Sequence, residues 1–114
     1  MKGTVRAEVL LWVAQRVSAG VLGVAVLVHL ATMSYAVRGG LTAAEILART
    51  RGSVGWLLFY GVFVLAVAVH APIGLRTIAR EWAGWHGPGL DTVVAVVALV
   101  LLVLGWRAVW AVFA

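Results

Sequence analysis

Two histidines lie inside strongly apolar stretches of this 114-residue chain, His29 in the first stretch and His70 in the second. An ionisable side chain at membrane depth is costly, so each is by default a candidate functional residue. A neutral imidazole is a good axial ligand for haem iron, and haem in so small a membrane protein indicates electron transfer. The alternative is a histidine that hydrogen-bonds a neighbouring helix or faces water.

Three apolar segments must position these side chains, at about residues 9–37, 54–78 and 92–113. Each is long enough for a helix across a hydrocarbon core of about 30 Å, and in lipid long continuous apolar runs form helices. The sequence therefore predicts an all-α membrane protein with three transmembrane helices in a single domain, residues 1–114. No cleaved signal peptide is expected, because the first run carries Arg16 and His29 and shows no small-residue cleavage motif.

The amino-acid composition excludes several classes of protein and several kinds of site. Hydrophobic residues make up 64% of the chain, well above the share in a soluble domain. The absence of cysteine excludes disulfides, thiolate haem ligands and iron–sulfur clusters held by this chain. The net charge of +5 belongs to loops and membrane interfaces and does not indicate nucleic-acid binding. Because basic residues are nearly balanced between the two sides, the charge pattern does not fix the orientation.

The two connections differ in character. The first contains the segment LTAAEILART, residues 41–50, which could form a short helix lying in the interface. The second, residues 80–89, is polar and contains glycine and proline that stop a helix. Asp91 or Thr92 is expected to begin the third helix, since aspartate is a good N-cap residue.

Helical periodicity places each histidine on a stripe with small or aromatic neighbours. On the first helix the stripe consists of Ser18, Leu22, Ala25 and His29, and on the second of Phe59, Phe63, Ala66, His70, Gly74 and Thr77. Alanine and glycine beside a histidine leave room for a flat macrocycle to approach the backbone, and phenylalanine could pack against its face.

Depth in the membrane separates the two histidines. The first two helices run in opposite directions, and a rise of 1.5 Å per residue separates His29 from His70 by roughly 15 Å along the membrane normal. One haem iron with two axial imidazoles needs rings only about 4 Å apart. The two residues therefore should not bind the same haem, and another chain must complete each ligand pair.

Basic residues near the ends of these helices have several uses. Arg16 could bind a haem propionate or a quinone carbonyl, or it could extend to the interface. Arg76 lies six residues after His70 and could reach a propionate of a haem held there, or act as an interfacial anchor. Arg80 and Arg107 are expected to be interfacial anchors. His86 lies in the glycine-rich connection and is expected to be solvated.

Two short motifs resemble those of a known family. Residues 15–20, Gln-Arg-Val-Ser-Ala-Gly, resemble the His/Gln-Arg-x-Ser-Gly motif on the first helix of succinate dehydrogenase cytochrome b membrane-anchor subunits, with Ala19 as an extra residue. Residues 70–78 resemble the second-helix motif His-x-x-x-Gly-Ile/Leu/Met-Arg through His70, Gly74 and Arg76. The length, the three helices and the motif order are also similar.

The resemblance implies a haem b-containing membrane-anchor subunit of succinate dehydrogenase or fumarate reductase, forming half of a haem-binding helical bundle. The implied partners are a second membrane-anchor subunit, an iron–sulfur subunit, a flavoprotein subunit, quinone and lipid, without nucleic acid. The succinate site would lie on the flavoprotein. The implied location is the cytoplasmic membrane of a bacterium or archaeon, with the N-terminus and the second connection on the cytoplasmic side.

The same resemblance assigns roles to residues. His70 matches the family's haem b ligand, and Arg76 matches a residue near the haem propionates. Arg16 and Ser18 match a region that forms part of the quinone pocket, although Trp12 stands where some relatives carry a quinone-contacting serine.

His29 bears on the number of haems. Two-haem anchors carry one histidine in each of the first two helices, some forty residues apart, and here the interval is 41. The chain resembles one half of a two-haem anchor, with His70 proximal to the iron–sulfur subunit and His29 distal. Two alternatives remain, a haem-free structural anchor of a dehydrogenase and a small transport subunit whose histidines relay protons.

Overall fold

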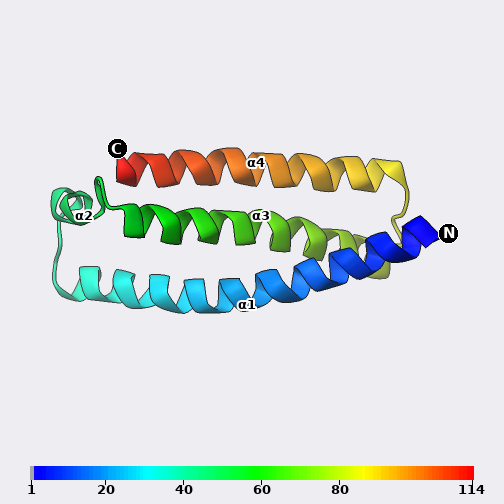
Figure 1. Ribbon diagram of the computed structural model, residues 1–114, viewed down its shortest axis with the longest axis horizontal. Helices are drawn as coiled ribbons and strands as arrows, with labels where there is room; N and C mark the ends of the chain where they lie inside the picture. The colour runs from blue at the N-terminus through cyan, green and yellow to red at the C-terminus, as the bar shows by residue number, and fades with distance from the viewer. Residues whose placement is uncertain (1) are drawn as a thin grey trace.

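The computed structural model describes residues 2–114 of the chain as four helices. They are α1 (Lys2–Arg38), α2 (Ala43–Thr50), α3 (Val54–Ala83) and α4 (Pro88–Phe113). Figure 1 shows α3 lying between α1 and α4, with α2 beside the C-terminus and the N-terminus at the opposite end. The helices α1, α3 and α4 are long and apolar enough to cross a membrane, which confirms the predicted all-α fold with three spans.

The helix α1 is longer than its apolar run. It has 37 residues and begins at Lys2 rather than near Val9, because Arg6, Ala7 and Glu8 are good helix formers that continue the helix. At 1.5 Å per residue its length is about 55 Å, well over the hydrocarbon thickness of about 30 Å. Its polar N-terminal turns are thus long enough to reach past the hydrocarbon core.

The connection between α3 and α4 is shorter than expected, because both helices extend into it. The helix α3 ends at Gly84, whose left-handed backbone with φ of 63° terminates the helix. The expected N-cap at Asp91 or Thr92 is wrong, since α4 begins at Pro88 with Gly87 as its N-cap. Proline suits the first helical position because its missing N–H would be unpaired there. Asp91 instead lies in the first turn, where the helix dipole favours an acid.

The predicted short helix in the first connection is confirmed as α2. Thr42 and Glu45 form a capping box, each side chain accepting a hydrogen bond from the other residue's backbone N–H. At the other end of α2, the Thr50 hydroxyl donates to the Val112 carbonyl at 2.7 Å and the Gly52 N–H donates to the Phe113 carbonyl at 2.9 Å. These bonds satisfy carbonyls that the last turn of α4 leaves unpaired.

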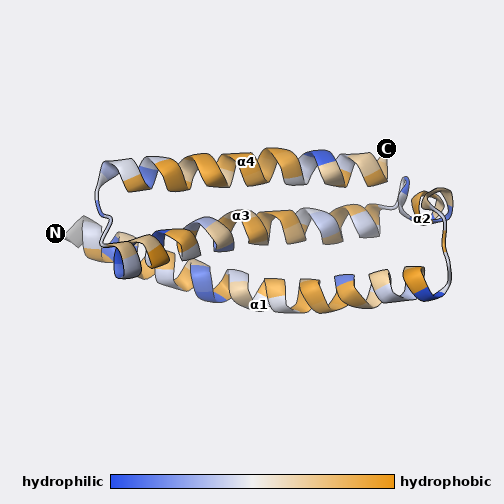
Figure 2. Ribbon diagram, turned by 180° about the vertical axis from the view of Figure 1, so that it is seen from behind, coloured by the Kyte–Doolittle hydropathy of each residue, from blue (hydrophilic) through white to orange (hydrophobic). Residues whose placement is uncertain are grey.

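Gly105 allows α3 and α4 to approach closely, while the outer surfaces of the helices remain apolar. A Cβ atom at Gly105 would lie 2.5 Å from Val64 Cγ1, so a larger residue does not fit between these helices. Figure 2 shows hydrophobic residues along most of the length of the three long helices. Large side chains such as Leu27 and Leu58 are more than 60% exposed, as expected for surfaces that face lipid.

Replacing Gly105 by alanine should destabilise the helix pair. Overpacking a tight contact costs about 1–3 kcal/mol, and the free energy of unfolding in SDS mixed micelles should fall by that amount. Gly61→Ala is the matched control, because a Cβ there meets no atom within 4 Å. Equal stability of the two variants would show that α3 and α4 do not need this close approach.

Candidate functional site

The stripe predicted on the first helix faces α3. Ser18 and Ala25 are buried, and Leu22 and His29 are partly buried on the same side. Ser18 lies opposite His70, with 3.4 Å between the serine Oγ and His70 Nδ1. The seam between α1 and α3 therefore contains both histidines named by the sequence.

Gly74 lies one turn beyond His70 and allows α1 to approach closely. A Cβ atom at Gly74 would lie 3.3 Å from Nε2 of Gln15, so the space expected beside this glycine is taken by the glutamine amide. The other amide atom, Gln15 Oε1, is buried without a hydrogen-bond partner in the described part of the chain. Pro72 is also buried here, and its ring removes one backbone donor two residues after His70.

A groove of about 770 Å³ runs along this end of the seam. It is lined by Glu8, Leu11, Trp12, Gln15, Arg16, Ala19, His70, Ile73, Gly74, Arg76, Thr77, Ile78 and Glu81. The groove therefore combines one imidazole and two guanidinium groups with apolar walls. Pockets of a few hundred Å³ with apolar walls and a few polar groups are typical ligand sites.

Arg16 adopts a contact that the sequence analysis did not anticipate. Its guanidinium carbon lies 5.1 Å from the centroid of the Trp12 ring, one turn earlier on α1. The negative face of the indole attracts the cation and holds it at the edge of the groove. The spacing of four residues between tryptophan and arginine is the sequence signal that could have revealed it.

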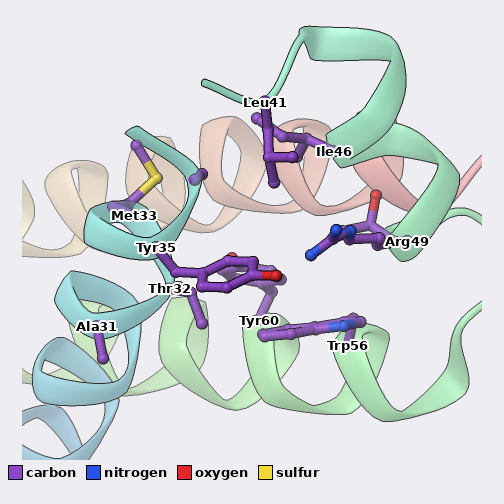
Figure 3. Close-up of a pocket in the computed structure, with 11 residues that line it drawn as sticks. Ala31, Thr32, Met33, Tyr35, Leu41, Ile46, Arg49, Trp56 and Tyr60 are labelled. Carbon is purple, nitrogen blue, oxygen red and sulfur yellow. The ribbon is translucent and has the colours of Figure 1, made fainter. Parts of the chain in front are cut away.

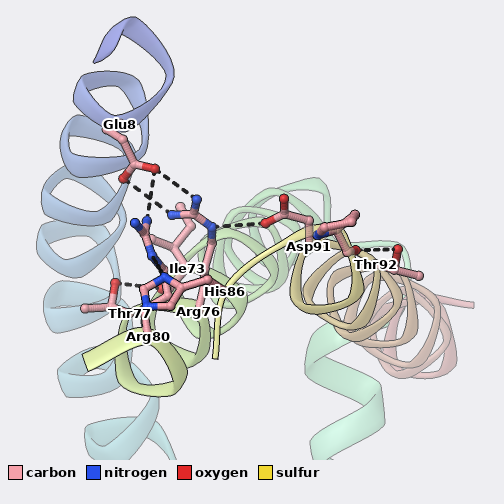
Figure 4. Close-up of polar contacts among 9 residues, drawn as sticks. Glu8, Ile73, Arg76, Thr77, Arg80, His86, Asp91 and Thr92 are labelled. Atoms are coloured by element: carbon pink, nitrogen blue, oxygen red, sulfur yellow. Dashed lines mark hydrogen bonds and ion pairs between the residues drawn. The ribbon is translucent and has the colours of Figure 1, made fainter. Parts of the chain in front are cut away.

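Arg76 is held by two acids from different helices (Figure 4). Its Nη2 and Nη1 donate to the two carboxylate oxygens of Glu8 at 2.9 and 3.4 Å, and its Nε donates to Asp91 at 3.3 Å. Arg80 also donates to Glu8, at 3.1 Å, and its Nε lies 3.4 Å from Nδ1 of His86. This cluster joins the ends of α1, α3 and α4.

The cluster revises the expectations for the basic residues of α3. Arg80, expected to be only an interfacial anchor, forms an ion pair with Glu8, and His86 contacts Arg80. Glu8 was not named from the sequence, because the first helix was expected to begin after it. The sequence did contain one indication of its role. The chain has only four acids, and this one lies about two turns before Arg16.

His29 has a different environment from His70. Its ring makes edge contacts with Tyr60 and Phe63, at centroid distances of 5.9 and 5.6 Å. Its Nδ1 is buried without a hydrogen-bond partner in the part of the chain that the structure describes. The ring also borders a cavity of about 460 Å³ whose other walls come from α2, α3 and α4, including Gly105. A buried imidazole nitrogen without a partner is uncommon and has a lone pair or proton available.

A second depression adjoins this cavity and shares Met33, Ile46, Thr50 and Tyr60 with it. Figure 3 shows Arg49 reaching toward Tyr35, with Trp56 and Tyr60 on the opposite wall. The Arg49 guanidinium carbon lies 5.3 Å from the Tyr35 ring centroid, and Trp56 stacks on Tyr60. The surroundings of His29 are therefore largely aromatic, whereas the groove beside His70 is lined by several charged side chains.

The contacts place the two histidines at different depths. His29 meets Phe63, and His70 is seven residues farther along α3, which corresponds to about 10 Å at 1.5 Å per residue. Along α1, Ser18 and His29 are eleven residues apart, or about 16 Å. The separation of roughly 15 Å expected from the sequence is close to the second value and larger than the first. Residues 2–114 contain no cluster of three or more His, Cys, Asp or Glu side chains able to hold a metal ion by themselves.

These features define a multi-pass α-helical membrane protein with a histidine inside each of two apolar spans. The family model described as the succinate dehydrogenase/fumarate reductase transmembrane subunit matches residues 2–113, so the chain belongs to that family. It is accordingly a membrane subunit of such a complex, as its motifs suggested. No curated protein and no solved structure matches the chain.

Glu8→Gln should weaken the contact between α1 and α3. Glutamine keeps the size of the side chain but removes the charge that pairs with Arg76 and Arg80. Because the carboxylate is 43% exposed, the expected loss is about 1 kcal/mol in the free energy of unfolding, and it should shrink at high salt.

The matched control is Glu81→Gln, since Glu81 lines the same groove and makes no ion pair among the described residues. A salt-independent effect, or the same loss in both variants, would contradict the assignment of the loss to this ion pair.

Proposed function

We propose that this subunit is a haem b-containing membrane anchor that docks an iron–sulfur and a flavoprotein subunit and passes electrons to quinone. The observation that carries the proposal is the groove between α1 and α3, where His70 lies among Arg16, Gly74 and Arg76. An axial nitrogen ligand and cations for two propionates are the groups that a haem requires from protein.

The chemistry of the available donors fits haem better than a bare metal ion. A haem iron is already held by four porphyrin nitrogens, so each chain needs to provide a single imidazole, and no cluster of ligands is required. His70 and His29 each provide one, and Nδ1 of His29 is buried with no hydrogen-bond partner among the described residues. Haem b, when bound, supplies a one-electron carrier, and the residues of this chain hold and orient it.

Arg76 retains donors for a propionate despite its two acidic partners. A guanidinium group has five N–H donors, and three of the contacts described above use Nε, Nη1 and Nη2 once each. Two N–H groups therefore remain. The acids fix the direction of the guanidinium, and this reduces the ordering cost of binding an anion.

The number of haems follows from the depths of the two histidines. Rings about 10–16 Å apart along the helices are too far apart for one iron, which needs them about 4 Å apart. We therefore assign His70 to a proximal haem and His29 to a distal one. The second axial ligand of each would come from the second membrane-anchor subunit.

The quinone site is proposed near Arg16 and Ser18. The Arg16 guanidinium is held at the groove edge by Trp12, where it can donate a hydrogen bond to a carbonyl oxygen. The same end of the molecule carries the N-terminus and the connection between α3 and α4, and we assign it to the cytoplasmic side, where the iron–sulfur subunit would dock. The proposed location is the cytoplasmic membrane of a bacterium or archaeon.

Replacing either histidine by alanine should remove one haem from the purified complex. A reduced-minus-oxidised spectrum should show a sharp alpha band in the green, and His70→Ala and His29→Ala should each lower the haem content per complex. His86→Ala is the control and should retain both haems, because His86 contacts Arg80 at the surface. A complex without haem would support a haem-free anchor, and one haem that survives His29→Ala would reject the distal assignment.

Arg16→Ala should impair quinone reduction and leave succinate–dye activity intact, because the dye accepts electrons before they reach this chain. Loss of a charged hydrogen bond corresponds to about a 10–100-fold decrease in kcat/KM for quinone. Arg107→Ala is the control, since Arg107 lies with Trp106 and Trp110 at the far end of α4. Unchanged quinone kinetics in Arg16→Ala would remove this residue from the site.

A further inference from the structure

Ser18 is among the few buried polar side chains in the described part of the chain, with 6% of its surface exposed. Its Oγ lies between two groups, 3.1 Å from the Gln15 carbonyl oxygen on α1 and 3.4 Å from Nδ1 of His70 on α3. The resemblance to relatives assigns this serine to a quinone pocket, but in this structure its hydroxyl contacts the imidazole of the candidate haem ligand. Both contacts must be satisfied by one hydroxyl.

We propose that Ser18 is a positioning residue that fixes the tautomer of His70, with the proton on Nδ1 and a free lone pair on Nε2. The inference about the tautomer follows from hydrogen bonding alone. Its consequence for iron rests on the haem-binding function proposed above.

The direction of the hydrogen bonds follows from the donors available. A hydroxyl has one proton, and a carbonyl oxygen can only accept, so the shorter 3.1 Å contact takes the serine proton. Toward His70 the serine oxygen must then accept, and Nδ1 must be the donor. A neutral imidazole carries a proton on only one nitrogen, which leaves Nε2 as the ligand atom.

This arrangement has the form that metal-bound histidines usually show. The second ring nitrogen donates a hydrogen bond, which fixes the ring orientation and raises the basicity of the ligating nitrogen. A more basic ligand stabilises ferric iron and lowers the midpoint potential of the haem. Removing the acceptor should therefore make the potential of the His70 haem more positive.

His29 lacks the same support. Its Nδ1 has no partner among the described residues, and the hydroxyl of Thr32 donates to the His29 backbone carbonyl instead, at 2.8 Å. Ser18 and Thr32 thus make the same bond to a carbonyl three residues earlier, but Ser18 alone of the two also contacts an imidazole. Thr32 is accordingly the matched control for Ser18.

The tautomer can be measured without haem by ¹⁵N NMR of the full chain in lipid bilayers with labelled histidine. We expect His70 in the wild type to carry its proton on Nδ1, and Ser18→Ala to shift the population to the Nε2–H form. Ser18→Thr should keep the Nδ1–H form, and Thr32→Ala should leave the His70 signals unchanged. An Nε2–H tautomer in the wild type, or no change in Ser18→Ala, would overturn the proposal.

The haem-loaded complex provides the second readout. In potentiometric titrations of the alpha band, Ser18→Ala should shift one haem to a more positive potential. The rate at which this haem is lost should increase about tenfold, because the ligating histidine loses the hydrogen bond donated by its other ring nitrogen. Ser18→Thr should restore both values, and Thr32→Ala should change neither for this haem. An unshifted potential in Ser18→Ala would overturn the consequence for iron. A wild-type complex without haem would reject the proposed function and leave the NMR result to decide the tautomer.

Discussion

Helices in a bilayer gain little from the hydrophobic effect when they associate, so α1 and α3 must be held by close contacts and polar bonds at their seam. Gly74 admits the Gln15 amide, Ser18 reaches His70, and the Glu8 carboxylate binds two arginines of α3. Each of these contacts crosses between the same two helices. The seam that holds α1 against α3 therefore also forms the candidate site, and a shift of α1 along α3 would disrupt both the packing and the site.

The two ends of the seam differ in the kind of polarity they offer. Near His70 the groove carries full charges, with Arg76 fixed by acids from α1 and α4. Near His29 the surroundings are aromatic, and the adjoining depression contains the cation Arg49, which lies against Tyr35. A cofactor at the first depth would meet a polar, charge-rich environment, and one at the second depth a largely apolar one. Since burial and nearby charge tune redox potential, two haems at these depths would differ in potential.

Much of this architecture could be predicted from hydropathy and helical periodicity. The three spans, the short helix α2 and the facing of Ser18, Ala25 and His29 toward α3 all follow from them. The helix ends could not be predicted in the same way, because polar residues with good helix propensity extend α1 and α3 beyond their apolar runs. Because the first helix was expected to begin after Glu8, this acid could not be paired in advance with an arginine of the second span. The Trp12–Arg16 and Ser18–His70 contacts depend on side-chain directions, which apolar patterning does not specify.

The bonds from Thr50 and Gly52 to the last carbonyls of α4 have a consequence for biogenesis. Thr50 and Gly52 precede Val112 and Phe113 by about sixty residues, so the two donors are synthesised before the last turn of α4. The helix α4 can thus finish its insertion against hydrogen-bond donors that the chain has already made. The carbonyls of its last turn then find partners within the protein and do not rely on lipid headgroups.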